Sequence, residues 1–159
     1  MILDDYMNAL LNKYIPGYTY NEIHEIIVDC NQRKAFLTAK DIDIKPSRVT
    51  MILMQLRGLP TKDLSLQGFI RNVCFTYLEE HLYSEFVIDA SQKNLAIFWN
   101  FYFEPLPGQT KIITETRILC LTTKSKMLFS LYWFFIKPFS GIIRKEMLRL
   151  IKKAVNRQH

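Results

Sequence analysis

The chain has few of the residues that mark a catalytic or metal-binding protein. Its three histidines, His24, His81 and His159, have no other ligand-type residues nearby at metal-binding spacing. Gly141 follows Ser140 without the partner glycine of a nucleophile elbow, and the five glycines form no loop that could cradle a phosphate. The sequence therefore predicts no catalytic signature, no metal and no cofactor.

Cysteines and long apolar runs are also scarce. The three cysteines, Cys30, Cys74 and Cys120, are far apart in apolar, strand-like surroundings, which indicates reduced, buried thiols. The N-terminus has acids where a secretory signal has basic residues. The longest apolar run near the end, residues 127–136, has ten residues, whereas a bilayer crossing needs roughly twenty. We therefore expect a cytoplasmic protein without a membrane span.

The chain is rich in apolar and aromatic residues. It has 159 residues, of which 49% are hydrophobic, enough to bury one sizeable core without disulfides or metal. Eleven Phe and eight Tyr exceed what a small core usually needs. They indicate either a well-packed core or a cavity lined by aromatic side chains.

Positive charge is concentrated near the C-terminus. From Lys111 onward the chain has eleven Lys or Arg and two acidic residues. Most of these cations fall on the expected outer face of the last helix: Arg144, Lys145, Arg149, Lys152, Lys153 and Arg157. Such a face is either solvated or attracted to an anionic membrane surface. Nucleic acid is a weaker alternative, because no aromatic residues are interleaved with the cations.

The last helix is the clearest element. Between residues 123 and 157, apolar residues recur at helical spacing and predict one long helix with a buried stripe. The stripe consists of Leu128, Tyr132, Ile136, Phe139, Ile143, Met147, Leu150, Ile151 and Ala154. Pro138 removes a backbone hydrogen bond, so we expect the helix to kink or break between residues 137 and 141.

The first half of the chain mixes helices with one strand. Residues 4–14 predict a short helix that caps the domain, and residues 21–29 predict a strand. Asn31 can cap a helix over residues 32–42, and a second helix follows over residues 48–60. Residues 64–68 fit either a loop or a short helical turn.

From Phe69 to Leu121 the pattern favours strands. We expect them near residues 72–79, 84–90, 95–104 and 111–121, joined by short turns into an antiparallel meander. In the strand predicted near residues 95–104, the odd positions form an entirely apolar face: Leu95, Ile97, Trp99, Phe101 and Phe103. The opposite face is only partly polar, so either both faces are covered or one borders a cavity or a second subunit of a homodimer.

The chain resembles the START-like superfamily in the order of its elements and in two segments. These are ITETRI at 113–118 and YWFFIKPFSGIIRKEMLRLIKK at 132–153. This superfamily includes Bet v 1 allergens, START domains and polyketide cyclases, and the similarity is to small bacterial members without assigned activity. It implies an α+β helix-grip fold, with a curved antiparallel sheet wrapped around a long C-terminal helix and two short helices inserted after the first strand.

The resemblance also implies how the chain is divided and where a ligand would lie. A single domain over residues 1–159 would have a helical cap at 1–16, the strands and helical pair at 22–121, and the long helix at 123–157. Members of the superfamily hold a hydrophobic ligand between sheet and helix. The strand region is short for the six strands usually found after the helical pair, which implies a smaller cavity or none.

Charged residues supply the first candidates for ligand binding. Glu115 and Arg117 are two apart on a strand and share a face. Facing a cavity, Arg117 could hold a ligand carboxylate or phosphate; facing outward, the pair would be a surface salt bridge. Arg144 would complete an anion site if the helix restarted after Pro138, or it would pair with an acid of the sheet, perhaps Glu115.

Aromatic residues supply the other candidates. The expected cavity-lining residues are Trp99, Phe101, Phe129, Tyr132 and Trp133, although aromatics at this spacing also form ordinary cores. We considered His24 on the first strand as an acid or base, against a histidine that is simply hydrogen-bonded.

These features predict a binding protein for a small hydrophobic or amphipathic molecule. One alternative is an enzyme of cyclase or hydratase type that uses Glu115, Arg117 or His24, an analogy with related folds. The other is a peripheral lipid-binding or lipid-transfer protein whose basic last helix faces anionic lipid.

Overall fold

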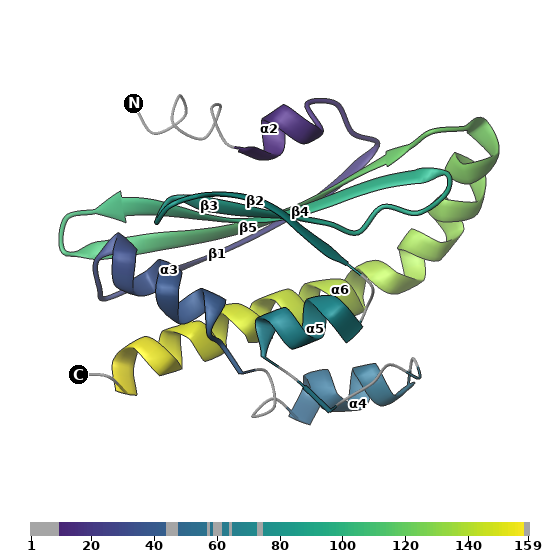
Figure 1. The fold of residues 1–159 in the computed structure, drawn as a ribbon. Helices are drawn as coiled ribbons and strands as arrows, with labels where there is room; N and C mark the ends of the chain where they lie inside the picture. Colours follow the sequence, from purple (N-terminus) through teal and green to yellow (C-terminus); the bar gives the residue numbers. More distant parts are fainter. Residues whose placement is uncertain are drawn as a thin grey trace.

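A computed structural model describes residues 10–43, 48–56, 58, 62–63, 65–72 and 75–157. Five antiparallel strands form one sheet in the order β1-β5-β4-β3-β2 (Figure 1). The strands are β1 (Tyr20–Val28), β2 (Thr76–His81), β3 (Glu85–Asp89), β4 (Leu95–Leu106) and β5 (Gln109–Cys120). The described helices are α2 (Leu10–Tyr14), α3 (Gln32–Lys40), α4 (Arg48–Leu56), α5 (Leu66–Asn72) and α6 (Thr123–Arg157).

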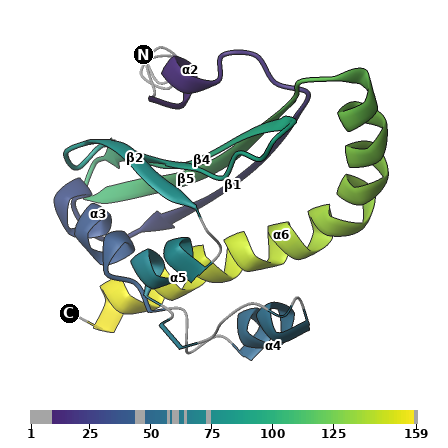
Figure 2. The same cartoon turned by 45° about the vertical axis from the view of Figure 1, so that its right-hand side comes forward.

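The two faces of the sheet are covered by different helices. Figure 2 shows the sheet curving over α6, with α2 on the opposite side. We call the side toward α6 the helix face and the side toward α2 the cap face. On β4, Trp99 and Phe101 belong to the helix face, whereas Phe98 packs against the α2 cluster of the cap face. The predicted helix-grip arrangement of sheet and C-terminal helix is confirmed.

Most elements lie where the sequence predicts them. Asn31 caps α3 by accepting a hydrogen bond from the backbone N–H of Lys34 at 2.9 Å. The strand β1 and the meander β3 to β5 agree with the predicted ranges to within a few residues. Of the cap helix predicted at 4–14, residues 4–9 lie outside the described residues, as do 57 and 59–60 of the helix predicted at 48–60.

The prediction of β structure from Phe69 onward was wrong at its start, because residues 66–72 form helix α5. The hydroxyl of Ser65 accepts a hydrogen bond from the backbone N–H of Gly68 at 3.0 Å, which satisfies one free donor of the first turn. Leu66, Phe69 and Ile70 are buried in the core. Tertiary packing therefore stabilises a helix that is too short to form by propensity alone.

The core fills the space between the helix face and the second half of α6. The sheet contributes Phe86, Ile88, Trp99, Phe101, Phe103 and Ile112, and α6 contributes Met147, Leu148, Leu150, Ile151 and Val155. Phe36 of α3 adds edge contacts to the rings of Phe86 and Phe103. Side chains thus occupy much of the region in which the resemblance implies a ligand cavity.

Helix α6 is continuous through Pro138 and bends near its middle (Figure 2). The expected kink is present as a bend in a continuous helix. The alternative, a break between residues 137 and 141 after which the helix restarts, is not observed. Within the described ranges, none of the helices combines the length and the apolarity that a membrane span needs.

The predicted buried stripe of α6 holds for only half of the helix. Met147, Leu150 and Ile151 are buried, as expected. In the first half, Leu128, Tyr132 and Phe139 are exposed, while the buried side chains are Phe129 and Trp133. In this half the predicted stripe is displaced by about one residue, because the buried residues Phe129, Trp133, Gly141, Leu148, Ile151 and Val155 follow one another at helical spacing along one side of α6.

The two described cysteines are free thiols: Cys30 is buried and Cys120 is partly buried. Cys74 lies outside the described residues.

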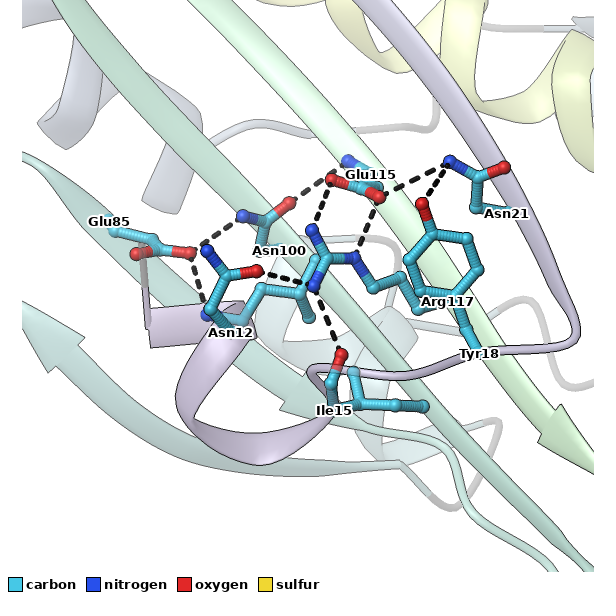
Figure 3. Close-up of polar contacts among 9 residues, drawn as sticks. Asn12, Ile15, Tyr18, Asn21, Glu85, Asn100, Glu115 and Arg117 are labelled. Carbon is cyan, nitrogen blue, oxygen red and sulfur yellow. Dashed lines mark hydrogen bonds and ion pairs between the residues drawn. The ribbon is translucent and has the colours of Figure 1, made fainter. Parts of the chain in front are cut away.

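A buried polar network ties the cap to the sheet (Figure 3). Arg117 donates from Nε to Glu115 Oε1 at 2.8 Å and from Nη2 to Oε2 at 3.3 Å. Its Nη1 donates to Asn12 Oδ1 at 2.6 Å and to the carbonyl of Ile15 at 3.0 Å. The Glu115 and Arg117 side chains are only 1% and 8% exposed, so this pair is neither a surface bridge nor part of the helix face.

A second carboxylate in this network, that of Glu85, accepts hydrogen bonds from the start of α2. The backbone N–H groups of Leu10 and Leu11 donate to Glu85, and Asn100 donates its amide to Glu85 Oε1 at 2.6 Å. Burial raises the pKa of the Glu85 carboxyl above its ordinary value of 4.5, although these three hydrogen bonds oppose the shift. Because no cation is hydrogen-bonded to Glu85 among the described residues, its negative charge is costly there.

Arg117→Met should lower the free energy of unfolding by about 3–5 kcal/mol, because it leaves Glu115 buried without its cation. Arg149→Met is the matched control, since its pair with Glu146 is exposed and should contribute under about 1 kcal/mol. Urea denaturation of both variants measures the difference. Equal losses would show that the Glu115–Arg117 pair does not anchor the cap.

The raised pKa of Glu85 predicts a pH dependence with a defined sign. The folded protein binds this proton more tightly than the unfolded chain, so ionisation opposes folding. The free energy of unfolding, measured relative to that of Glu85→Gln, should fall as pH rises above 4.5 through the raised pKa. A rise over the same range would mean that the hydrogen bonds outweigh burial.

Candidate functional site

Polar side chains gather on the helix face where β1 meets the middle of α6. In β1, alternate residues face α6, and Val28 at one end enters the core. Toward the other end of the strand the same face carries Glu22 and His24, opposite Thr116 and Thr114 of β5. We call this group, together with Trp99, Gly141 and Arg144, the Glu22–Arg144 cluster.

The guanidinium group of Arg144 lies over an aromatic ring. Its guanidinium carbon is 3.5 Å from the centroid of the Trp99 ring, a distance that allows a cation–π interaction. Trp99 is held in place because its Nε1 donates to Thr114 Oγ1 at 2.6 Å, and that hydroxyl donates to the carbonyl of Asn100 at 2.8 Å. The sheet therefore fixes the surface on which Arg144 stacks.

The charge of Arg144 is poorly compensated. The residue as a whole is partly exposed, but its Nη1 is buried and has no hydrogen-bond partner among the described residues. Burial lowers the pKa of Arg144 to about 9, and the negative charge of Glu22 opposes this shift. Buried guanidinium nitrogens are normally hydrogen-bonded, so this one is an exception that needs an explanation.

Glu22 has the complementary deficit. Its side chain is 8% exposed, and Oε1 lies 2.9 Å from His24 Nε2. The second oxygen, Oε2, is buried without a hydrogen-bond partner among the described residues. A Cβ at Gly141 would lie 2.6 Å from Glu22 Oε1, so the missing side chain of Gly141 allows the carboxylate to approach α6.

The two unsatisfied atoms define what the cluster can bind. Arg144 Nη1 can only donate a hydrogen bond, and Glu22 Oε2, when ionised, can only accept one. A hydroxyl or an amide can both accept and donate, so a group of this kind has the chemistry that the two atoms need. Within the described ranges, no group of three His, Cys, Asp or Glu side chains is placed to hold a metal ion.

The predicted site residues are divided among several places. Trp99 and Arg144 belong to the cluster, and the Phe101 ring is beside that of Trp99, with centroids 5.2 Å apart. Phe129 and Trp133 pack elsewhere on the helix face, with Tyr20 and Ile118. Tyr132 is exposed, with its ring against Phe129.

Glu115 and Arg117 lie on the cap face, away from the aromatic candidates, with which the prediction grouped them (Figure 3). The suggestion that Arg144 pairs with Glu115 was wrong, because the acid whose charge acts on Arg144 is Glu22. Placing Arg144 on the outer face of the helix was also wrong. Glu22 was missed, although it shares a strand face with His24 and the buried Val28.

A groove of about 640 Å³ lies between α3 and the second half of α6. Its lining includes Arg33, Lys34, Arg149, Lys153 and Arg157, together with Asp41 and Asp43. None of the residues of the Glu22–Arg144 cluster borders it. The groove therefore collects several of the cations that the sequence places on the last helix.

No protein-family model matches the chain, and neither does any curated protein sequence. Solved structures do match. A conserved protein from Geobacillus kaustophilus is 9% identical with a TM-score of 0.53, over 88% of this chain and 97% of that one. A START superfamily protein from Mycobacterium smegmatis is 10% identical with a TM-score of 0.50, over 90% of this chain and all of the other.

The di-domain ARO/CYC protein BexL of the BE-7585A biosynthetic pathway is 11% identical, with a TM-score of 0.47. The match covers 87% of this chain but 47% of BexL. At these identities the comparisons show the fold alone. The chain has the helix-grip fold of START-like proteins.

Gly141→Ala should push the Glu22 carboxylate away from α6, because the new Cβ would lie 2.6 Å from Oε1. We expect the NMR signals of the His24 ring to shift as its contact with Glu22 changes. Gly17→Ala is the control, since a Cβ there meets nothing within 4 Å. Unchanged His24 signals in Gly141→Ala would contradict the described packing of Glu22 against the helix.

Proposed function

We propose that this helix-grip protein binds a small, mostly apolar molecule with a neutral polar group, held where β1 and β4 face the middle of α6. The observation that carries the proposal is the pair of buried, unsatisfied atoms, Glu22 Oε2 and Arg144 Nη1. An unsatisfied buried polar group costs about 1–3 kcal/mol, and more when it is charged. A ligand that satisfied both atoms would recover this free energy as affinity.

The residues around the cluster favour a ligand whose remaining part is apolar. Trp99 and Phe101 supply aromatic surface, and Ile26 and Ile143 pack against the same core. A hydroxyl or carboxamide at the end of an apolar molecule fits the two charged groups. A carboxylate would repel Glu22 and an ammonium would repel Arg144, so ionic head groups are less favourable.

A matched series of decyl compounds tests the head-group preference. Decanol and decanamide should raise the melting temperature of the protein, whereas decanoate and decyltrimethylammonium should raise it less. The double variant Glu22→Gln/Arg144→Met should lose the discrimination within the series. The control is Arg149→Met, which changes a cation outside the cluster and should respond like the wild type.

Native mass spectrometry of the purified protein tests the same proposal without a chosen ligand. We expect a retained small molecule that disappears in the double variant but stays in the control. A protein that retains nothing, and that no member of the series stabilises, would overturn the proposal.

The contact between His24 and Glu22 supports a second candidate, an enzyme that moves a proton on a bound carbonyl compound. A histidine oriented by a carboxylate can act as a general base or acid, and Arg144 could polarise the carbonyl oxygen. In this candidate the chemistry lies at His24 instead of Glu115 or Arg117, which form hydrogen bonds within the cap-face network. Once a turnover is found, His24→Asn should abolish it while leaving ligand retention unchanged; persisting turnover would exclude this candidate.

A further inference from the structure

The first half of α6 exposes an unusually large apolar surface. Its exposed side chains include Met127, Leu128, Leu131, Phe134, Phe135, Phe139 and Ile142. Phe134 is 76% exposed and Leu131 is 67% exposed, values close to those of fully solvated side chains. We call these seven residues the α6 outer face. A contiguous apolar surface of this kind usually marks an interaction site.

None of the described helices and strands covers this face. Leu128, Leu131, Phe135, Phe139 and Ile142 follow one another at three- and four-residue spacing, so they lie along one side of the helix. The buried residues of the same half, Phe129 and Trp133, pack against the sheet. Figures 1 and 2 show this half of α6 at the margin of the molecule, at the end opposite to α3.

The charges on this part of α6 are all of one sign. Between residues 123 and 145 there are four exposed lysines, Lys124, Lys126, Lys137 and Lys145, and no acidic residue. Two copies of this face packed together would bring lysines toward lysines, which disfavours a dimer through it. An anionic surface would instead attract all four.

Apolar and aromatic residues beside lysines are the composition of helices that lie in a membrane interface. Phenylalanine and leucine side chains enter the boundary between head groups and acyl chains, while lysines reach the anionic head groups. We infer that the first half of α6 docks on the surface of an anionic lipid bilayer, with the α6 outer face buried in the interface.

This inference does not depend on the proposed ligand site. The Glu22–Arg144 cluster lies between the sheet and α6, whereas the α6 outer face points away from the sheet. The structure places the membrane contact on the first half of α6, not on the basic second half, where Arg149, Lys153 and Arg157 border the groove with α3.

Vesicle co-sedimentation of the full chain tests the inference. The protein should sediment with phosphatidylcholine vesicles that contain phosphatidylglycerol, sediment much less with phosphatidylcholine alone, and be released by added salt. Leu131→Ser/Phe135→Ser should weaken binding by about tenfold or more, because both side chains would lose their burial in the interface. Lys124→Gln/Lys126→Gln/Lys137→Gln should remove the preference for anionic lipid.

Two control variants test whether vesicle binding is specific to the α6 outer face. Leu82→Ser changes a side chain that is 64% exposed in the turn between β2 and β3, and it should leave vesicle binding unchanged. Lys153→Gln/Arg157→Gln removes cations from the second half of α6 and should also bind as the wild type does. Circular dichroism of each variant verifies that it is folded before its binding is compared.

Three outcomes would overturn the inference. The wild type could fail to bind anionic vesicles, or it could bind neutral and anionic vesicles equally. It could also form a dimer in sedimentation velocity that Leu131→Ser/Phe135→Ser dissociates, which would make a second copy the occupant of the face.

Discussion

A charge removed from water must be hydrogen-bonded, and this requirement separates the two faces of the sheet. On the cap face, Arg117 donates to Glu115, Asn12 and Ile15, and the pair is closed within the protein. On the helix face, the Glu22 side chain and the Nη1 atom of Arg144 are also buried, yet Glu22 Oε2 and Arg144 Nη1 have no hydrogen-bond partner among the described residues. The chain therefore contains one buried arginine–glutamate pair that is hydrogen-bonded within the protein, and a second arginine and glutamate that each keep one unsatisfied buried atom among the described residues.

The contrast assigns different roles to the two faces. The Glu115–Arg117 pair fixes α2 on the sheet, so its charges are used in folding. Glu22 and Arg144 lie between the sheet and α6, and Arg144 is beside a tryptophan that the sheet immobilises through Thr114. Most of the adjoining helix–sheet interface is packed with side chains, so any ligand must be small or must displace part of the packing.

Local pattern predicted much of this fold. Alternation along β4 predicted its apolar helix face, Asn31 predicted the start of α3, and apolar spacing predicted α6. Helix α5 could not be read in the same way, because its few residues are helical through burial of Leu66 and its neighbours. The register of β1 on β5, which brings Glu22 toward Arg144, is a tertiary feature that spacing alone does not contain. Pro138 was recognised, but the buried side of the first half of α6 includes Phe129 and Trp133 instead of the predicted Leu128 and Tyr132.

The central claim is that Glu22 Oε2 and Arg144 Nη1 lack partners because a ligand supplies them. An experimental high-resolution structure of the protein as purified from cells tests this most directly. We expect density for a small molecule whose polar group bridges the two atoms. Density showing the two side chains bonded to each other, or to ordered water alone, would contradict the claim.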